Sequence, residues 1–392
     1  MAHFGDMANE IYAGGLAGRR PELPMTAEGL AAAAREVMSD EAYSYVAGGA
    51  STERTIAANR EAFARWRIVP RMLRGVSARD LSTTMLGTPM TAPVLTAPVG
   101  VQGLVHPDAE LAVTRAAAAL GLTSVLSTAS STTLEDVAAA APGAARWFQL
   151  YWPRDLQLAE SLVRRAETAG YQAIVLTVDT WSLGWRPRDL ALAHLPFLHA
   201  KGIANYLSDP VFRARLAAPP EESPQAMQAA ARACVEVFGN PALGWSDLSL
   251  LRQWTRLPVL IKGICHPEDA RIALDHGVDA LVVSNHGGRQ VDGARAALDC
   301  LPGVVAAVDG RAPVLLDSGI RCGADILIAL ALGAHAVLLG RPWVYGLGLA
   351  GQRGVDHVLR VLLGDLDLTL VLAGYASPSE LGAYSVVRDV VG

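Results

Sequence analysis

The sequence predicts an α/β protein folded as a (β/α)8 TIM barrel, with an N-terminal helical extension and a long loop insertion after strand 4. Two observations support this fold class. Eight short runs rich in Val, Ile and Leu alternate along the chain with helix-compatible stretches, as in a barrel of βα units. The runs are also apolar throughout instead of alternating, as expected for parallel strands buried on both faces. A doubly wound open sheet is the competing fold, because it has the same alternation.

The eight expected strands share an apolar composition and a turn signal at each end. They are Val94–Pro98, Thr123–Ser127, Trp147–Tyr151, Ala173–Val178, Pro258–Lys262, Ala280–Ser284, Pro313–Asp317 and Ala336–Gly340. The helix-compatible stretches between and after them are Pro107–Ala119, Leu134–Ala141, Arg154–Ala169, Pro267–His276, Gly323–Leu332 and Gly354–Leu363.

The first 90 residues carry helical patterning and precede the first strand. A start signal at Thr26 leads into a helix expected over Ala27–Met38, and Asp40 precedes a second segment, Glu41–Val46. Side chains such as Thr and Asp favour helix starts because their oxygens accept hydrogen bonds from free backbone N–H groups. We therefore expect helices, and no barrel strand, in this part of the chain.

The interval between the fourth and fifth strands is much longer than the others. It covers residues 179–257 and contains aromatic residues, prolines and a helix-like stretch, Pro224–Phe238. A long βα loop on the catalytic face of a barrel usually forms a lid or part of the substrate pocket. No repeat or linker marks a second domain, so we expect one domain over residues 1–392. Its parts are the N-terminal helical segment 1–90, the barrel 91–363 with the insertion 179–257, and the C-terminal segment 364–392.

Composition and charge exclude several classes of protein. Half of the residues are apolar (51%) and 18% are charged, which is ample for a large core and unlike a disordered chain. The net charge of −5 is spread without acidic or basic blocks, so no nucleic-acid partner is expected. Residues 1–22 lack the apolar core of a secretory signal, and charged or turn residues interrupt every later apolar run.

The cysteines do not form a recognisable framework. Cys234, Cys265, Cys300 and Cys322 lie far apart without CxxC spacing, which favours free thiols. No metal site is expected. Together with the missing signal and membrane segments, this pattern indicates a protein of the cytoplasm.

Polar side chains follow nearly every expected strand. In a barrel, residues at the carboxyl ends of the strands point into the active site, so eight such ends in succession indicate a shared ligand site. They are Pro98-Val99-Gly100, Ser127-Thr128, Gln149-Leu150-Tyr151, Thr177-Val178-Asp179, Lys262-Gly263, Ser284-Asn285-His286, Asp317-Ser318-Gly319 and Gly340-Arg341.

The ends of the last two strands indicate a phosphate site. The run Asp317–Arg321 and the run Gly340–Pro342 combine glycines with Arg321 and Arg341. Glycines let backbone N–H groups approach an anion, and barrels commonly bind phosphate after these two strands. The residues alone leave open whether the phosphate belongs to a substrate or to a cofactor; two tight turns with surface arginines are the structural alternative.

His286 follows the sixth strand within a glycine-rich run and is a candidate general base. Asp179 ends the fourth strand, and a carboxylate that hydrogen-bonds an imidazole fixes its tautomer and supports its charged form. Arg289 and Arg186 could grip a carboxylate with paired hydrogen bonds. A histidine with a purely structural role, and a surface turn around Arg186, are the alternatives.

Lys262 stands out by composition. The chain has 33 basic residues, and Lys201 and Lys262 are its only lysines. A lysine inside an apolar strand is costly to bury without an anionic partner. An electron-rich cofactor ring or a phosphate would supply one.

Taken together, these residues resemble the FMN-dependent 2-hydroxy-acid dehydrogenase/oxidase family. The run Ser284–Gln290 (SNHGGRQ) looks like the active-site signature of that family. Further matching segments occur in the same order, namely Tyr43–Gly49, Ala97–Gln102, Phe148–Tyr151, Leu176–Thr180, Lys262-Gly263, Asp317–Arg321 and Gly340–Pro342. Within the family, the likeness is strongest to the lactate 2-monooxygenases. It lies in Asn9–Tyr12, Pro70–Leu73, Asp179–Trp181, Gly184–Leu190, Asp209–Phe212 and the long segment Leu190–Leu257.

The resemblance implies a role for each catalytic candidate. His286 would remove a proton, and Asp179 would orient and support it. Arg289 and Arg186 would hold the substrate carboxylate with help from Tyr45, which composition alone would make a packed helix residue. Tyr151 would hydrogen-bond the substrate hydroxyl.

The cofactor implied by the resemblance is FMN. Lys262 would lie beside the N1/O2 edge of the flavin, and Gly100 would face its reactive N5 side. The residues implied to bind FMN are Pro98, Val99, Gly100, Ser127, Gln149, Thr177, Lys262, Ser284, Asp317, Ser318, Gly319, Ile320, Arg321, Gly340 and Arg341.

The activity implied is FMN-dependent oxidation of a small, lactate-like L-2-hydroxy acid to a 2-oxo acid. Oxygen would be the acceptor, with oxidative decarboxylation if the enzyme works as a lactate 2-monooxygenase. Alternatives are a simple oxidase that releases hydrogen peroxide, and a dehydrogenase for a larger or aromatic acid such as mandelate. Proton abstraction to a carbanion and direct hydride transfer both stay open.

Ala129 departs from part of the family pattern. Some relatives carry a bulky aromatic or a larger aliphatic residue here, so Ala129 should leave room beside the substrate side chain. The family also implies a homo-oligomer, a tetramer or larger. Two other classes fit the residues less well: a barrel isomerase or lyase with a phosphorylated substrate, and a non-catalytic binding barrel.

Overall fold

The computed structural model describes residues 3–389, and its centre is a closed parallel barrel. The barrel strands pair in the order β10-β11-β4-β5-β6-β7-β8-β9, and β9 closes the ring on β10. They are β4 Val94–Thr96, β5 Thr123–Ser127, β6 Arg146–Leu150, β7 Ile174–Thr177, β8 Val259–Ile264, β9 Ala280–Val283, β10 Val314–Leu316 and β11 Ala336–Leu339. Each predicted strand is present within two residues at either end. The predicted barrel is confirmed, and the open sheet is excluded.

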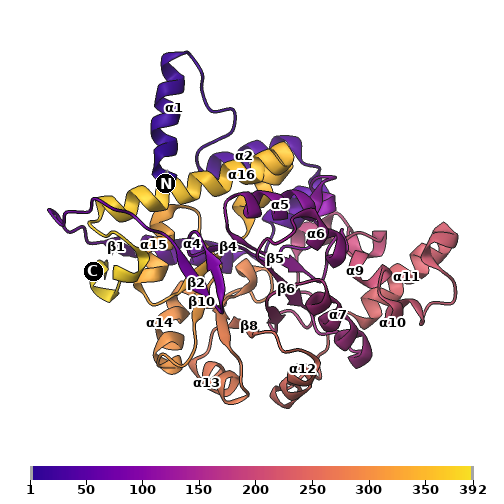
Figure 1. The fold of residues 1–392 in the computed structure, drawn as a ribbon. Coiled ribbons are helices and arrows are strands. Elements are labelled where there is room, and N and C mark those ends of the chain that lie inside the picture. The colour runs from indigo at the N-terminus through magenta and orange to yellow at the C-terminus, as the bar shows by residue number, and fades with distance from the viewer. Residues whose placement is uncertain (1–2, 390–392) are drawn as a thin grey trace.

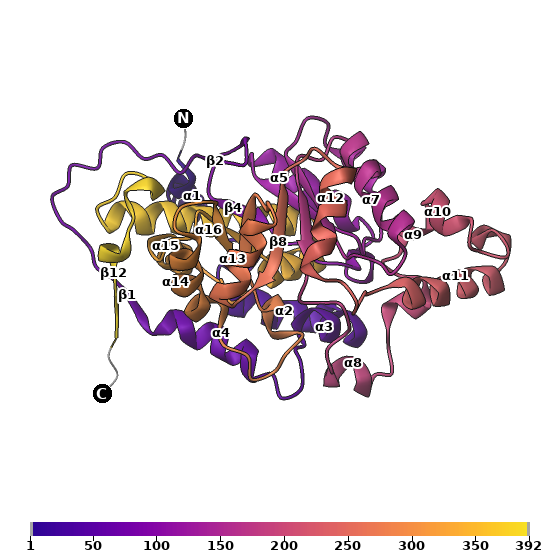
Figure 2. The ribbon, with the colours of Figure 1, turned by 90° about the horizontal axis from the view of Figure 1, so that it is seen from below.

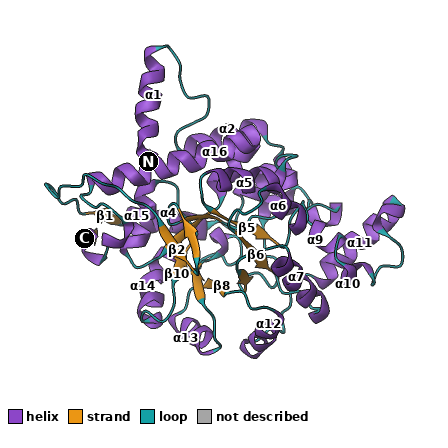
Figure 3. Ribbon diagram, in the orientation of Figure 1, coloured by secondary structure: helices purple, strands orange, loops and turns teal. Residues whose placement is uncertain are grey.

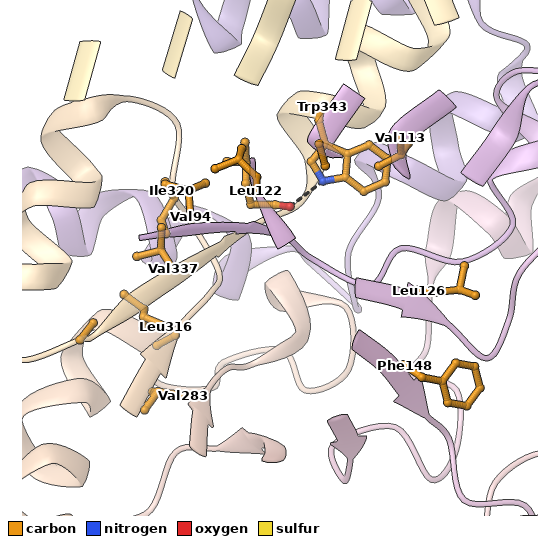
Figure 4. Packing of buried hydrophobic residues seen from close by; sticks show 14 of the residues in the cluster. Val94, Val113, Leu122, Leu126, Phe148, Val283, Leu316, Ile320, Val337 and Trp343 are labelled. Atoms are coloured by element: carbon orange, nitrogen blue, oxygen red, sulfur yellow. Dashed lines mark hydrogen bonds between the residues drawn. The ribbon is translucent and has the colours of Figure 1, made fainter. Parts of the chain in front are cut away.

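Helices surround the strands on the outside of the barrel (Figure 3). The outer helices are α5 Ala109–Ala119, α6 Leu134–Ala140, α7 Leu156–Thr168, α12 Leu248–Trp254, α13 Pro267–Asp275, α14 Ala297–Val308, α15 Gly323–Ala331 and α16 Arg341–Leu372. Strand side chains such as Val94, Leu126 and Phe148 pack into the layer between strands and helices (Figure 4). Trp343 of α16 lies in this layer and donates a hydrogen bond from Nε1 to the carbonyl of Leu339, 2.6 Å away.

A second apolar cluster fills the inside of the barrel. It contains alternate strand residues such as Leu95, Trp147 and Leu260, together with Met85 and Met90. The two methionines come from a hairpin, β2 Thr83–Met85 and β3 Thr88–Met90. Because both faces of each strand are buried, the strands read as continuous apolar runs in the sequence.

The N-terminal segment is helical as predicted but also contains short strands. Its helices are η1 Phe4–Asp6, α1 Met7–Leu16, α2 Ala27–Val37, α3 Asp40–Ala47 and α4 Arg54–Ala64. The side chain of Thr26 caps α2, but Ser39 caps α3 in place of the expected Asp40, which is the first helical residue. Strand β1 (Trp66–Ile68) pairs with β12 (Val386–Arg388), so the segment after α4 meets the C-terminal segment beside the barrel (Figure 2). Helix α1 stands off the body and buries none of its residues (Figure 1).

The insertion after β7 forms a compact group of short helices at one side of the barrel (Figures 1 and 2). They are α8 Pro187–Ala191, η3 Pro196–His199, α9 Ala204–Leu207, α10 Pro210–Arg213, η4 Pro220–Glu222, α11 Pro224–Val237 and η5 Trp245–Asp247. The predicted helix is therefore confirmed as α11. The barrel helix before β8 is α12, which also lies within residues 179–257. Further short turns are η2 Gln102–Leu104, η6 His286–Gly288, η7 Pro378–Glu380 and η8 Ala383–Ser385.

The helix predicted over Gly354–Leu363 is too short. In the structure it belongs to α16, which runs from Arg341 to Leu372 and bends at Ala350 and Gly351, where the backbone leaves helical geometry. Four glycines between 346 and 354 lower the helix propensity of this stretch. For this reason the sequence does not indicate that the helix begins before Gly354. The predicted boundary at 363/364 falls inside α16. The division into 1–90, 91–363 and 364–392 otherwise stays a prediction.

No helix in the described part of the chain combines the length and the apolar character needed to cross a bilayer.

Candidate active site

A large cavity opens at the carboxyl ends of the barrel strands. Its volume is about 1000 Å³, including space open to solvent. The sequence-predicted residues that line it are Tyr45, Pro98, Val99, Gly100, Ser127, Tyr151, Arg186, Lys262, His286, Arg289, Asp317, Ser318, Gly319, Ile320, Arg321, Gly340 and Arg341. The insertion adds Leu183, Arg186, Phe197 and Phe238 to the wall, so its predicted place at the pocket is confirmed.

The other predicted residues lie immediately behind this wall. Asp179 contacts His286, and Ser284 accepts a hydrogen bond from Lys262. Gln149 accepts a hydrogen bond from Ser127, and Thr177 pairs in register with Lys262. The structure thus brings every predicted site residue into the cavity or into direct support of a residue that lines it.

His286 is held by a carboxylate and a hydroxyl from the end of β7. Its Nδ1 lies 2.8 Å from Oδ1 of Asp179 and 2.9 Å from Oγ1 of Thr180. Thr180 also donates a hydrogen bond to Oδ1 of Asp179 at 2.9 Å. A proton on Nδ1 directed at the carboxylate leaves Nε2 as the basic nitrogen, and Nε2 lies 3.5 Å from the hydroxyl of Tyr151.

The charges around His286 favour a neutral imidazole beside an ionised carboxylate. Burial lowers the pKa of His286 more than the charge of Asp179 raises it. Burial raises the pKa of Asp179, but His286, Lys262 and the hydrogen bond from Thr180 outweigh it and leave this pKa at about 2. A neutral histidine at physiological pH can accept a proton, as a general base must.

The backbone is left-handed at His286 and at the glycine that follows it. His286 has φ of 57° and Gly287 has φ of 64°, in the left-handed region that non-glycine residues rarely adopt. The amide of His286 donates to Oγ of Ser284 at 3.0 Å, and the amide of Gly287 donates to Oγ of Ser318 at 3.0 Å. Strained residues held by their surroundings often occur at functional sites.

A pair of arginines lines the same cavity as His286. Arg289 packs its guanidinium over the ring of Tyr45 at 5.0 Å and donates to the carbonyl of Gly48 at 2.8 Å. Arg186 donates from Nη2 to Oε1 of Gln290 at 3.0 Å. Neither arginine forms a salt bridge with a carboxylate within residues 3–389. Burial, followed by the charge of Arg186, lowers the pKa of Arg289 to about 9.

A second pair of arginines lies at the ends of β10 and β11. Burial, followed by the charge of Arg341, lowers the pKa of Arg321 to about 10. Arg321 donates from Nη1 to the carbonyl of Ile320, whereas Arg341 donates to the three carbonyls of Val46, Gly48 and Gly287 at 2.9 Å each. Both side chains line the cavity without an acidic partner in the described chain. Buried cations of this kind are stabilised by a bound anion.

Lys262 lines the same cavity as the two arginine pairs but has acidic partners. Its Nζ is 2.9 Å from Oγ of Ser284, 3.2 Å from Oδ2 of Asp317 and 4.0 Å from Oδ2 of Asp179. Burial lowers the pKa of Lys262, but the two carboxylates outweigh it, so the pKa is raised and the ammonium stays charged. Gly263 follows with φ of 114°, where an added Cβ would lie 2.8 Å from that of Asp179. A glycine is needed there to bring the two residues together.

Comparison with known proteins identifies the family. The family model described as FMN-dependent dehydrogenase matches residues 34–388. The chain belongs to this family. An L-lactate oxidase of Lysinibacillus sphaericus is 45% identical over 347 residues, which cover 88% of each chain. Human 2-hydroxyacid oxidase 1 is 41% identical over 87% of this chain and 90% of its own.

Solved structures of the family agree with this assignment. Mandelate oxidase bound to (S)-4-hydroxymandelic acid superposes with a TM-score of 0.83 at 41% identity, covering 94% of this chain and 100% of that one. A lactate oxidase of Pediococcus acidilactici gives the same TM-score at 34% identity, with 93% and 94% covered. The protein is therefore an oxidoreductase, and its cofactor is FMN.

Two polar side chains immediately behind the cavity wall have atoms that fit the cofactor. Nε2 of Gln149 and Oγ1 of Thr177 are buried without a hydrogen-bond partner. They belong to neighbouring strand ends, beside Ser127 and Lys262. Unpaired buried donors are costly, and the polar edge of a flavin ring would pair with them. Arg321, which lines the cavity, fits the phosphate of FMN.

Phosphate recognition by Arg321 can be tested with two cofactors that differ only in the phosphate. In Arg321→Met, we expect the Kd for FMN to rise about 10- to 100-fold, since hydrogen bonds to charged groups contribute about 1.5–3 kcal/mol. The Kd for riboflavin should stay unchanged. Quenching of flavin fluorescence measures both, and Arg353→Met on the exposed surface is the matched control. Equal weakening of FMN and riboflavin would contradict the role.

Several residues of the site were not predicted from the sequence. Thr180 follows Asp179 directly, and its position after a strand was the only available signal. Phe197 and Phe238 come from the insertion and stack with ring centroids 5.7 Å apart. Phe238 also packs edge-on against Tyr151 at 5.2 Å. Their place in the wall depends on how the insertion folds back, which no local pattern reveals.

Proposed function

We propose that this enzyme oxidises an L-2-hydroxy acid to the corresponding 2-oxo acid and passes the electrons to oxygen. The observation that carries the proposal is a neutral, carboxylate-supported His286 that faces the same cavity as Arg289 and Arg186. Neither arginine has an acidic partner among residues 3–389. Such a site offers a base for the hydroxy acid and cations for its carboxylate. The L-lactate oxidase and human 2-hydroxyacid oxidase 1 relatives support the same substrate class.

The substrate carboxylate would bind the two arginines. The planar guanidinium of Arg289 can form paired hydrogen bonds with a carboxylate, and its stacking on Tyr45 fixes its orientation. The hydrogen bond from Arg186 to Gln290 fixes the position of the second guanidinium. A carboxylate bound in this way would direct C2 and its hydroxyl towards Tyr151 and His286.

His286 would hold at Nε2 the proton that leaves the substrate. Asp179 stabilises the resulting imidazolium through Nδ1, and Thr180 fixes the orientation of that carboxylate. Burial raises the pKa of Tyr151, so its hydroxyl remains a hydrogen-bond donor for the substrate oxygen. Bound FMN would supply the two-electron acceptor, and the charged Lys262 in the same cavity would stabilise negative charge on it.

The pH dependence of this reaction follows from His286. Because its pKa lies below the ordinary value of about 6.5, kcat/KM should fall only as the pH drops below that value. In Asp179→Asn, loss of the neighbouring negative charge should move this acidic limb to still lower pH. The maximal rate should fall as well, since the imidazolium loses its support. A pH profile of kcat/KM for both proteins measures the shift, and an upward shift would contradict the assignment.

The products formed with oxygen distinguish a simple oxidase from a lactate 2-monooxygenase. A simple oxidase converts the 2-hydroxy acid and oxygen into the 2-oxo acid and hydrogen peroxide. A lactate 2-monooxygenase converts lactate and oxygen into acetate, carbon dioxide and water. We favour the monooxygenase because the segments around Asn9–Tyr12 and Gly184–Leu190 resemble that group. Aerobic turnover with measured 2-oxo acid, peroxide and decarboxylated product distinguishes them: acetate without free peroxide supports our choice, and stoichiometric peroxide favours the oxidase.

A dehydrogenase acting on a larger acid such as mandelate is the second candidate. Ala129 favours it, because its methyl group leaves space beside the substrate position. Turnover that requires a quinone or protein acceptor instead of oxygen would support it.

Anaerobic bleaching of the flavin by a 2-hydroxy acid excludes an isomerase, a lyase or a non-catalytic barrel.

We further propose a homo-oligomer, a tetramer or larger, that works in the cytoplasm. Helix α1 stands off the body with no buried residue and exposes Tyr12 and Leu16, as a segment that packs on a neighbouring subunit would. All four cysteines are free thiols, as is usual for proteins of a reducing compartment. Light scattering of the purified protein measures the mass of the assembly.

A further inference from the structure

A buried asparagine of helix α4 contacts the turn that carries His286. Asn59 is at the middle of α4 and only 2% exposed. Its Nδ2 donates a hydrogen bond to Oδ1 of Asn285 at 2.9 Å, and Nδ2 of Asn285 donates one to Oδ1 of Asn59 at 2.8 Å. The same oxygen of Asn59 accepts a hydrogen bond from the amide of Ala297 at 3.1 Å. Because Asn59 is buried, it cannot leave this amide pair without a cost in free energy.

Asn285 connects the amide pair to the backbone on both sides of the loop. Its Oδ1 accepts a hydrogen bond from the amide of Gly288 at 3.2 Å, and its Nδ2 donates one to the carbonyl of Arg295 at 3.2 Å. All hydrogen-bonding positions of this side-chain amide are therefore used. The bond to Gly288 closes the turn over His286 and Gly287, where the backbone is left-handed. A left-handed histidine is unfavourable by itself, so the surrounding bonds must hold the turn in this shape.

Other residues of α4 contact the rest of the same loop. Thr55 donates a hydrogen bond from Oγ1 to the carbonyl of Val291 at 3.0 Å and accepts one from the amide of Ala294 at 3.1 Å. The backbone of Ile56 lies so close to Gly288 that an added Cβ there would be 2.8 Å from its nitrogen. The amide pair is the member of this set nearest along the chain to the candidate base.

We propose that Asn59 is a positioning residue for the general base, and that it acts through Asn285 on the turn in which Nε2 of His286 faces the substrate. The inference rests on the proposed function, since it assumes that His286 takes up a proton from a 2-hydroxy acid. Neither asparagine lines the active-site cavity, so loss of Asn59 should slow the chemical step more than it weakens substrate binding. Arg289 has its own anchor at the carbonyl of Gly48 and should still hold the carboxylate.

The first test is the rate of flavin reduction in Asn59→Ala at saturating substrate. A misplacement of about 1 Å caused by a mutation away from the chemistry can cost about 100-fold, so we expect a loss of about 10- to 100-fold per bound flavin, with a much smaller change in KM. Stopped-flow absorbance measures the rate. In Asn59→Ser, the hydroxyl can still accept the amide of Ala297 but is too short to form the amide pair, and we expect a similar loss. An original rate of reduction in either variant overturns the inference.

A double-mutant cycle tests whether Asn59 acts through Asn285. Two residues that act on the same element give losses that do not multiply, whereas independent residues give losses that do. Adding Asn59→Ala to Asn285→Ala should therefore leave the rate of flavin reduction within about twofold of that of Asn285→Ala alone. A further loss equal to the full effect of Asn59→Ala overturns the proposed route.

The pH profile distinguishes positioning of His286 from a loss of folded protein. In Asn59→Ala, the turn should open and let water reach the imidazole. Burial is the largest cause that lowers the pKa of His286, so this pKa should rise towards its ordinary value. The charged groups around His286, namely Asp179, Lys262 and Arg186, stay in place. The acidic limb of kcat/KM should therefore move to higher pH, opposite to the shift expected for Asp179→Asn. A limb that stays in place or moves to lower pH overturns the inference.

Hydrogen exchange provides a readout without turnover. The amides of His286 and Gly288 are hydrogen-bonded in the turn, and peptides covering residues 284–290 should exchange faster in FMN-loaded Asn59→Ala. Val113→Ala removes buried volume from α5 outside the active-site cavity and is the control for lower stability. It should leave this exchange and the rate of flavin reduction unchanged.

The exchange result also separates this inference from the proposed function. Unchanged exchange of residues 284–290 in Asn59→Ala overturns the positioning role, whatever the protein oxidises. If no 2-hydroxy acid bleaches the flavin of the original protein anaerobically, the proposed function fails instead.

Discussion

Replacing His286 with alanine is expected to lower kcat about 10³-fold, within the 10²- to 10⁴-fold range of general acid–base catalysis. The variant loses the nitrogen that faces the substrate and leaves Asp179 and Thr180 without their imidazole partner. FMN should still bind, because most of the residues expected to bind the cofactor come from other strand ends. Stopped-flow reduction of the flavin by substrate measures the loss directly.

Two controls separate this effect from general damage to the site. The flavin absorbance of His286→Ala should match that of the original protein at equal loading. Replacing His335 with alanine changes a histidine away from the cavity, whose Nδ1 accepts a hydrogen bond from the amide of Val314, and should leave the rate of reduction within twofold. A turnover rate in His286→Ala close to the original rate would rule out its role as the base.

Replacing Arg289 with methionine is expected to lower kcat/KM about 100-fold or more, mainly through a higher KM. Removal of one partner from a buried, hydrogen-bonded charge pair costs about 2–5 kcal/mol, and each 1.4 kcal/mol is a factor of ten. Methionine keeps most of the length of the side chain but removes the donors aimed at the carboxylate. Steady-state kinetics with a 2-hydroxy acid measures the change.

Arg289→Lys refines this prediction. Lysine retains the charge but loses the planar pair of donors and the stacking on Tyr45, so an intermediate loss is expected. Arg360→Met removes an exposed arginine paired with Asp356 on α16 and is the matched surface control. If Arg289→Met left KM unchanged and lowered only kcat, carboxylate binding would have to be assigned elsewhere.

The barrel could be predicted from the sequence because its strands are buried on both sides. Strand β5 was predicted without error over Thr123–Ser127, and it is buried at every position. The polar residues at strand ends then followed from the geometry of a barrel, which collects them at one rim. For this reason His286, Asp179 and Lys262 could be placed together although they come from three different strands.

Features that depend on contacts distant in the sequence could not be predicted. Helix α14 contains Pro302, which usually ends a helix, and tertiary packing overrides that preference. The wall formed by Phe197 and Phe238 requires the insertion to fold back over the barrel. The sequence predicted that Arg341 binds phosphate. It did not indicate that this side chain also donates three hydrogen bonds to backbone carbonyls far away in the chain.

These three bonds of Arg341 set an order in which the site can be assembled. The residue follows the last barrel strand, and two of its acceptors, the carbonyls of Val46 and Gly48, lie near the beginning of the chain. During synthesis, the segment that carries Tyr45 leaves the ribosome long before Arg341 exists to fix it. The wall that orients Arg289 can therefore be completed only after the last barrel strand has been synthesised.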